Sequence, residues 1–386
     1  MAGAARYTAE VDSTIDQTAA AATGTDPAGL EKVVALFRAQ LEQGLHPGAS
    51  LSVRREGRIV LEAWGGSMQP GAAEPAVTAD ALFLIFSATK PLTSTAIQIL
   101  VEREQVDLDA PVARYWPGFA ANGKEGVTLR HVLSHQGGFP VGPGWLTWEH
   151  WRDRSAIVRA MEERRLRWEP GTDVGYHPLN YGWVLGEILH RVDGRSLGRF
   201  LKGEVFEPLG LNDTWLGLPA GQHERVARLI DLSGNHDYIP DFNRPEVHAT
   251  ECGAATGVTT TRDLSRFYTM LVNGGELDGV RILKPESVAR ATGVTVETQK
   301  DRTLQVPIRW GLGFHVGGDP SPFGTKRSPV TFGHTGQGCT IGWGDPTRDL
   351  AVAYFTNGVQ ESVANFMRNS RMSDAILDAA PPRGRD

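Results

Sequence analysis

The chain has 386 residues, and its 39 Lys and Arg against 45 Asp and Glu give a formal net charge of −6. That balance argues against a protein that holds the backbone of DNA or RNA, because such proteins need a basic surface. The two cysteines, Cys252 and Cys339, are too few for a disulfide framework or a zinc-thiolate cage, and no apolar run approaches the roughly 18 residues of a membrane helix. We therefore expect a globular protein of about two to three domains, with no metal, cofactor, nucleic-acid partner or membrane partner.

Residues 1–29 are rich in Ala and Thr and include several acidic side chains. They lack the basic segment followed by an apolar stretch that marks a secretory signal, so a cytoplasmic protein is the default expectation. We expect these residues to form a loosely attached N-terminal tail.

The next part of the chain predicts a helix followed by a β-hairpin. Apolar residues recur at helical spacing over 30–41. Two alternating segments, 49–54 and 58–64, are joined by a short Arg-Glu-Gly link, which is a hairpin signal. A short apolar run of strand character follows at 81–86.

Helical patterns dominate the middle of the chain. The expected helices cover 87–104, 152–166, 183–192 and 262–271. Between the last two, residues 230–255 have little periodicity, and a loop of that length inside a compact chain is more often functional than not.

Strand character returns late in the chain, before a final helix expected over 363–377. The expected strands are 311–316, 331–334, 340–343 and 350–356. Because strands lie at both ends and helices between them, we predict an α/β (α+β) fold with an antiparallel sheet built from both chain ends and flanked by terminal helices. The expected division is an α/β domain of residues 30–86 and 290–386 and a mostly helical domain of 87–289, with the active site at their interface.

Three patterns favour a structural interpretation over a catalytic one. Residues 194–198 match G-x-S-x-G, but a helix precedes them where a nucleophile elbow needs a strand, so Ser196 is expected to cap the next helix. His131 and His135 are four apart but lack the acidic partner of a metal-binding helix. A tryptophan stripe at 145, 148 and 151 predicts a packed face, with an apolar wall for a bulky acyl or alcohol group as the alternative.

The segment Ser87-Ala88-Thr89-Lys90 carries the chemistry. It lies where an apolar run meets a helix, and the spacing puts the hydroxyl and the amine on one helical face. A neutral amine can take the proton of a serine hydroxyl and so make it a nucleophile. We expect the positive end of the helix, together with partial burial, to lower the pKa of Lys90.

Two further motifs complete the candidate site. Tyr176 follows a turn ahead of the helix expected at 183–192, and a phenol near a lysine can shuttle protons. The late segment His334-Thr335-Gly336 has small residues that let a substrate lie against a strand edge. The backbone N–H groups of Ser87 and Gln337 are expected to form the oxyanion hole.

With these motifs, the sequence resembles the serine β-lactamase and penicillin-binding protein superfamily, class C branch, and most closely the family VIII carboxylesterases. The resemblance covers about residues 30–377 and rests on these further landmarks: 114–117, 127–135, 204–211, 253–264, 332–336 and 344–346. It implies that Ser87 is the acylated nucleophile, Lys90 its proton partner and Tyr176 the second base and acid.

Two departures from the β-lactamase pattern favour the esterase branch. Pro178 stands where β-lactamases have the Asn of Tyr-x-Asn, so the amide that holds a lactam is missing. His334 replaces the lysine of the third motif, so a permanent cation that recognises a carboxylate becomes a mostly neutral imidazole. Both changes weaken binding of anionic lactams and suit neutral esters.

The expected function is therefore a serine carboxylesterase that acts on short-chain or small-acyl esters through an acyl-enzyme. The alternatives are a β-lactamase or D-amino-peptidase type of amide hydrolase, an acyltransferase that uses the same acyl-enzyme, and a non-catalytic protein that binds a partner through the cleft. No pattern specifies an oligomeric state.

Other residues near the motifs have expected roles as well. His334, Thr335 and Gly336 are expected to contact substrate, although His334 could instead replace the lysine structurally. Trp343 and Tyr238 are candidate walls of the acyl pocket, with packing as the alternative. His177 is expected to be structural, and Cys339 to be a small buried apolar residue near the oxyanion strand.

Overall fold

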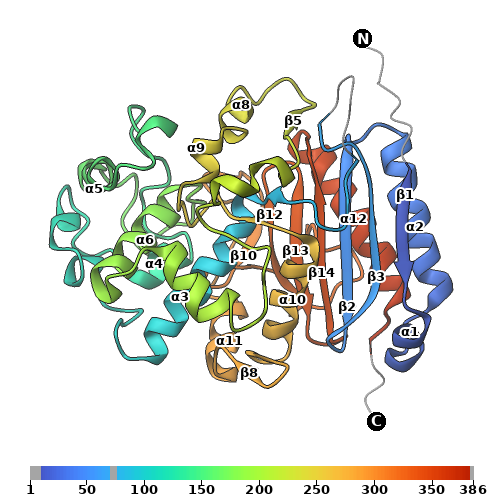
Figure 1. The fold of residues 1–386 in the computed structure, drawn as a ribbon. Coiled ribbons are helices and arrows are strands. Elements are labelled where there is room, and N and C mark those ends of the chain that lie inside the picture. The colour runs from blue at the N-terminus through green and yellow to red at the C-terminus, as the bar shows by residue number, and fades with distance from the viewer. Residues whose placement is uncertain (1–9, 70–75, 383–386) are drawn as a thin grey trace.

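A nine-stranded antiparallel sheet is the centre of the molecule in the computed structural model, which describes residues 10–69 and 76–382 (Figure 1). The strand order is β1-β3-β2-β14-β13-β12-β11-β10-β9, so strands from both chain ends meet where β2 pairs with β14. This arrangement confirms the predicted sheet. Its strands are β1 (Val11–Ile15), β2 (Gly48–Arg55), β3 (Arg58–Gly66), β9 (Val296–Thr298), β10 (Ile308–Trp310), β11 (His315–Val316), β12 (Phe332–Gly336), β13 (Thr340–Asp345) and β14 (Leu350–Thr356).

Small two-stranded pairings accompany the main sheet. They are β4 (Phe83–Leu84) with β6 (Val258–Thr259), β5 (Ile230–Asp231) with β15 (Gly358–Val359), and β7 (Glu276–Leu277) with β8 (Val280–Arg281).

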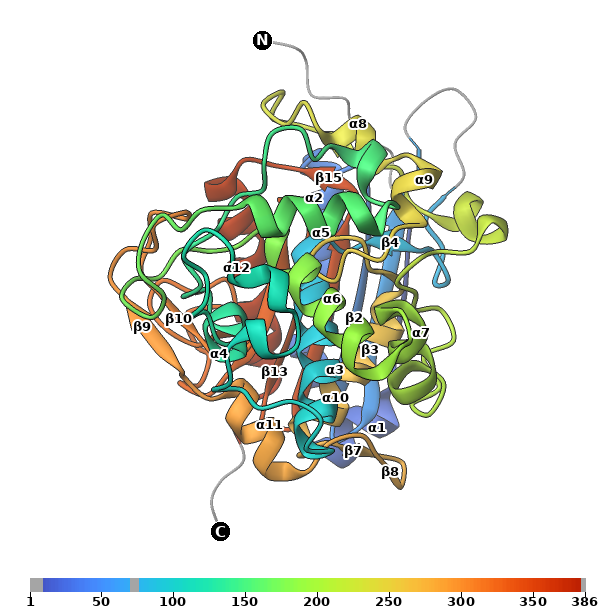
Figure 2. The same cartoon turned by 90° about the vertical axis from the view of Figure 1, so that its left-hand side faces the viewer.

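Helices cover both faces of the sheet, with the terminal helices on one face and the middle of the chain on the other (Figures 1 and 2). The helices of the first face are α1 (Gln17–Thr23), α2 (Pro27–Glu42) and α12 (Ser362–Ala379). The remaining α-helices are α3 (Lys90–Glu102), α4 (Leu129–Leu133), α5 (Arg154–Glu163), α6 (Asn180–Asp193), α7 (Leu197–Leu201), α8 (Ile239–Phe242), α9 (Pro245–His248), α10 (Thr261–Val272) and α11 (Pro285–Thr292).

Alternation along β13 separates the two cores. Ile341 and Trp343 belong to the core shared with the terminal helices, whereas Gly342 and Gly344 face α10. A Cβ on Gly342 would lie 2.5 Å from a ring carbon of Tyr268, so only glycine lets α10 pack this closely on the sheet.

The expected N-terminal tail is wrong for residues 10–29. β1 pairs with β3 in the register Val11 to Gly65, and α1 begins at the N-cap Asp16, whose side chain accepts the N–H of Ala19. Residues 1–9 of the expected tail lie outside the described residues. Strand β1 is short and mostly exposed. Its sequence, Val-Asp-Ser-Thr-Ile, therefore lacks the apolar pattern by which a core strand is predicted.

The structural interpretations of two misleading patterns are confirmed. Gly194 ends α6 with φ +88°, and Ser196 is the N-cap of α7, so the G-x-S-x-G segment is a turn between helices. His131 completes a capping box with Thr128 at the start of α4.

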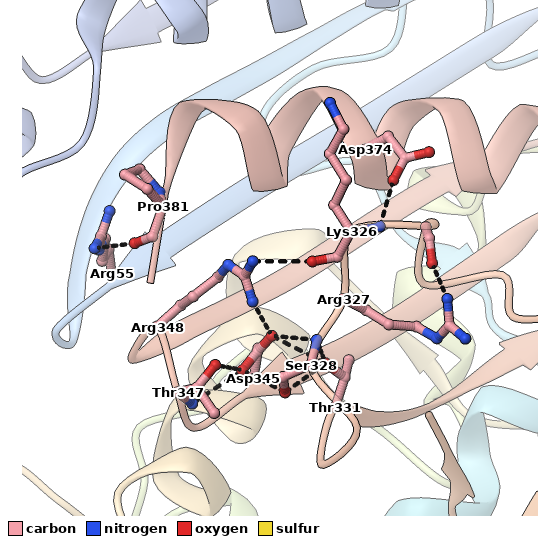
Figure 3. Close-up of polar contacts among 11 residues, drawn as sticks. Arg55, Lys326, Arg327, Ser328, Thr331, Asp345, Thr347, Arg348, Asp374 and Pro381 are labelled. Atoms are coloured by element: carbon pink, nitrogen blue, oxygen red, sulfur yellow. Dashed lines mark hydrogen bonds and ion pairs between the residues drawn. The ribbon is translucent and has the colours of Figure 1, made fainter. Parts of the chain in front are cut away.

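A buried carboxylate anchors the chain that leads into β12. Asp345, at the end of β13, is fully buried and accepts hydrogen bonds from Ser328, Thr331 and Thr347 (Figure 3). It also pairs with Arg348 at 2.8 Å, and Arg348 donates in turn to the carbonyl of Lys326. These contacts fix the loop that precedes β12 and so help to set the position of that strand.

None of the described helices combines the length and apolarity needed to span a bilayer.

Candidate active site

Ser87 and Lys90 lie within one turn, as their spacing predicts. Ser87 belongs to the 3-10 helix η1 (Phe86–Thr89), and Lys90 begins α3. The Nζ of Lys90 lies 3.1 Å from the Oγ of Ser87. Just before the serine, Phe86 has φ +46°, which is a strained value for a bulky residue. Its buried ring packs against Phe242, with the ring centroids 4.8 Å apart. The packing of Phe86 holds the sharp turn that presents Ser87.

Lys90 is completely buried behind the serine. Its Nζ lies 2.7 Å from the phenol oxygen of Tyr176, 2.9 Å from the carbonyl of Pro178 and 3.2 Å from the carbonyl of Ala254. Burial lowers the pKa of Lys90 to about 7. The lowered pKa of Lys90 confirms the expectation, but its main cause is full burial and not the positive end of the helix.

The partners of Lys90 suit a neutral amine. A neutral amine has two N–H groups and one lone pair, and the carbonyls of Pro178 and Ala254 can only accept. When both N–H groups point to these carbonyls, the single lone pair is left to accept a hydrogen bond from either Ser87 or Tyr176, whose hydroxyl oxygens lie 3.1 and 2.7 Å away. The site can therefore hold a base next to the nucleophile at neutral pH.

Tyr176 is fixed by stacking and by a buried carboxylate. Its ring lies on Trp310 with centroids 5.5 Å apart and planes 13° apart. Burial raises the pKa of the Tyr176 phenol, which a hydrogen bond with Ser87 opposes in part. The phenol is therefore protonated at neutral pH and can donate a proton or relay one.

Asp301 supports this tyrosine, and no sequence pattern indicated it. Its fully buried carboxylate accepts the backbone N–H of Tyr176 at 3.0 Å and the N–H groups of Thr303 and Leu304, each at 2.8 Å. It also accepts the indole N–H of Trp310 at 3.4 Å. A single aspartate in a polar stretch between strands carries no recognisable signal of this role, because Tyr176, the partner from the site, lies 125 residues away in the sequence.

The turn after β12 lies beside the nucleophile. Gly336 approaches the segment before Ser87 so closely that a Cβ there would lie 2.3 Å from the carbonyl oxygen of Ile85. The hydroxyl of Thr340 donates to the same carbonyl at 3.0 Å. Ser87 and Gln337 line one cavity, which is compatible with the expected pairing of their N–H groups as an oxyanion hole.

His334 is a buried, neutral side chain. Its Nδ1 lies 2.7 Å from the carbonyl oxygen of Thr335, so Nδ1 carries the proton. Burial, together with the nearby Lys90, holds the pKa of His334 well below its ordinary value. The position at which a β-lactamase would carry a lysine therefore holds no cation.

A cavity of about 430 Å³ opens in front of these groups. Its described lining residues include Ser87, Tyr176, His334, Thr335 and Gly336, and none of them is Asp, Glu, Lys or Arg. Lys90 is not among them, because it lies behind Ser87 and Tyr176. The cavity thus offers a nucleophile and a phenol in an uncharged surface.

Trp343 and Tyr238, the two residues expected to wall the pocket, are not among its lining residues. Trp343 is fully buried in the core beneath the terminal helices, on the other face of β13. Tyr238 packs against His236 and Phe242 instead. The walls come instead from residues 304–310, which no motif singles out, and from the start of α12.

Two residues beside the site have structural roles. His177 is buried, and its Nε2 accepts the N–H of Phe139, as expected of a structural histidine. Cys339 is fully buried, as expected, and burial raises the pKa of its thiol to about 12. Within residues 10–69 and 76–382, no three His, Cys, Asp or Glu side chains gather in a way that could hold a metal ion.

Comparisons with known proteins place the chain among proteins of one fold and family. The family model described as Beta-lactamase matches residues 33–376. The esterase/beta-lactamase LipL of Mycobacterium tuberculosis is 34% identical in an alignment of 357 positions that covers 84% of this chain and 80% of LipL.

Two solved structures share the fold. A penicillin-binding protein homologue from Caulobacter crescentus superposes with a TM-score of 0.84 at 30% identity, over 95% of this chain and 100% of that one. A family VIII carboxylesterase superposes with a TM-score of 0.83 at 30% identity, over 96% of this chain and 100% of that one.

Proposed function

The chain belongs to the beta-lactamase family, and we propose that it is a carboxylesterase that cleaves short-chain or small-acyl esters through an acyl-enzyme on Ser87. The coarser assignment, a serine hydrolase with the β-lactamase fold, follows from the family itself. The carboxylesterase assignment rests on one observation. Lys90 contacts both Ser87 and Tyr176, and these two residues line a cavity whose described lining residues are uncharged. An anionic lactam would leave its carboxylate without a cationic partner there, whereas a neutral ester needs none.

The proposed acylation step moves one proton and exchanges one bond. Ser87 Oγ adds to the ester carbonyl carbon, and its proton passes to the neutral amine of Lys90. The negative charge on the carbonyl oxygen is stabilised by the N–H groups of Ser87 and Gln337. The bond to the alcohol then breaks. The departing oxygen takes the proton of Tyr176, and Lys90 returns its proton to the phenol oxygen.

Deacylation repeats these transfers with water. Tyr176 takes a proton from a water molecule and passes its own proton to Lys90 as the water oxygen adds to the acyl carbon. The Ser87 oxygen then leaves with the proton of Lys90, which restores the neutral amine. Burial raises the pKa of Tyr176, so its phenol stays protonated and suits the relay. Burial lowers the pKa of Lys90, so its neutral amine suits the role of the base.

Amide or lactam hydrolysis is a second candidate, since LipL carries both names. The proposal predicts that nitrocefin is turned over at least about tenfold more slowly than p-nitrophenyl butyrate, given the missing cation at His334. Acyl transfer is a third candidate, and added alcohols that divert the acyl group from water would identify it.

A substrate panel of p-nitrophenyl acetate, p-nitrophenyl butyrate and nitrocefin, run with the wild type and Ser87→Ala, tests the proposal. Ester turnover that Ser87→Ala abolishes supports it. Equal turnover of nitrocefin and the esters contradicts the preference for esters, and the absence of Ser87-dependent ester turnover contradicts the proposal as a whole.

A further inference from the structure

Exposed apolar side chains gather at the mouth of the active-site cavity. Leu304 (39% exposed), Val306 (42%) and Val363 (75%) all line it. Met367 (45% exposed) lies one helical turn beyond Val363 on α12. Single exposed apolar residues need no explanation, but a group of them at the rim of a cavity is typical of a binding surface.

The apolar surface continues inward to the nucleophile. Pro307, Ile308 and Trp310 extend it from Leu304 and Val306, and Phe366 extends it from Val363. Ser87 lines the same cavity, so a hydrocarbon chain of the substrate can lie along these residues while the ester carbon is next to the serine.

The contacts of Tyr176 indicate which part of an ester lies on this surface. Trp310 stacks on the tyrosine ring, and Asp301 binds the tyrosine backbone together with the N–H of Leu304. The part of the apolar surface formed by residues 304–310 is therefore attached to the side of the site that carries Tyr176, and Val363 lines the same cavity. In the proposed mechanism the leaving alcohol takes its proton from this phenol, so the alcohol departs past this wall.

We propose that the groove formed by Leu304, Val306 and Val363 binds the hydrocarbon chain of the substrate's alcohol, and that the enzyme prefers small-acyl esters of medium-length apolar alcohols. This inference rests on the proposed esterase function and adds to it the class of alcohol. It places the small acyl group and the apolar chain on different sides of the reacting carbon.

Alkyl acetates of increasing length test the proposal directly. From butyl acetate upward the leaving alcohols have nearly the same chemical reactivity, so a change in kcat/KM reports binding of the chain. We expect kcat/KM to rise from butyl to octyl acetate, by up to about fourfold for each added methylene that becomes buried. All esters are used below their solubility limits. A parallel series of p-nitrophenyl esters, from acetate to octanoate, is expected to show no such rise.

Val363→Asp provides the matching variant. Residue 363 lies in the first turn of α12, where an acidic side chain is compatible with the helix, so the variant is expected to fold. We expect it to lower the ratio of kcat/KM for octyl acetate over butyl acetate by at least about fivefold. Val294→Asp is the control, because Val294 is an exposed valine (51%) outside the lining of the cavity, and it should leave this ratio unchanged.

The possible failures can be told apart. Turnover of butyl acetate with no increase toward octyl acetate overturns the inference and leaves the esterase function in place. A rise in the acyl series instead puts the chain on the acyl side and also overturns it. If no ester is hydrolysed, the proposed function fails and the inference fails with it.

Discussion

The carboxylate of Asp301 accepts the backbone N–H of Tyr176 at 3.0 Å, across 125 residues of sequence. The same carboxylate holds the turn that carries Leu304. One buried side chain therefore sets the position of the phenol relative to the cavity wall, although it touches neither the nucleophile nor the cavity.

Replacing Asp301 with Asn should act mainly on kcat. An amide puts an NH₂ group where only acceptors fit, so either Tyr176 or the neighbouring turn must shift. A displacement of about 1 Å can cost up to about 100-fold in rate, and we expect a 10- to 100-fold loss of kcat with little change in KM for a short ester. Asp374→Asn is the control, because Asp374 holds the turn at Thr325 and Lys326 away from the site (Figure 3). An equal loss of kcat in both variants would contradict a positioning role for Asp301.

The activity should rise with pH through about 7. Burial lowers the pKa of Lys90 to about 7, and only its neutral form accepts the serine proton, so kcat/KM is low below this value and reaches a plateau above it. His334→Lys adds a second cation near Lys90 and should move the inflection to lower pH. Initial rates between about pH 5 and 9 measure both profiles. An activity that does not change with pH over this range would argue against Lys90 as the base.

Removing the phenol oxygen of Tyr176 should cost about 10³-fold in kcat/KM, because the relay between Lys90 and the leaving alcohol is lost. The ring of Tyr176→Phe can keep its stacking on Trp310, so the variant should remain folded. Tyr181→Phe is the matched control, since its phenol is buried nearby and donates to the backbone carbonyl of Lys90, at 3.3 Å, and has no part in the proposed relay. Near-full activity of Tyr176→Phe would show that its assigned role is wrong.

The sequence predicted those features that depend on local spacing. The strand expected at 350–356 is observed as Leu350–Thr356, and the predicted closeness of Ser87 and Lys90 follows from a single helical turn. Contacts between distant segments were harder to predict. Asp301 was missed because nothing in its own neighbourhood shows that it binds Tyr176.

Trp343 was misplaced for a related reason. It pairs across the sheet with Gly333, whereas His334 pairs with Gly342, so Trp343 and His334 lie on opposite faces. That relationship is set by the register of β12 and β13, which depends on the turn between them and could not be read from the motif alone. The strand at Val11–Ile15 was missed because one edge strand needs few apolar residues.

The Asp345 cluster should stabilise the fold in a pH-dependent way. Burial alone would raise the pKa of Asp345, but hydrogen bonds from Thr347 and Ser328 and the charge of Arg348 hold it below its usual value. Its contribution is therefore present above about pH 4, the pKa of an unfolded aspartate, and is lost as the pH falls further. Urea unfolding at several pH values measures this dependence.

Asp345→Ala leaves Arg348 without its buried partner, and we expect a loss of about 3–5 kcal/mol in the free energy of unfolding at neutral pH. Asp378→Ala removes an exposed ion pair with Lys326 and should change stability by less than about 1 kcal/mol. Similar losses in the two variants would contradict the role assigned to Asp345.

The formation of an acetyl-enzyme is the most direct test of the catalytic assignment. After brief mixing with p-nitrophenyl acetate and quenching in acid, intact-mass and peptide analysis should find one acetyl group, on the peptide that contains Ser87, together with a burst of p-nitrophenol close to one equivalent. The adduct and the burst should both disappear in Ser87→Ala. Hydrolysis that continues in Ser87→Ala, or an acetyl group on another residue during turnover, would contradict the account.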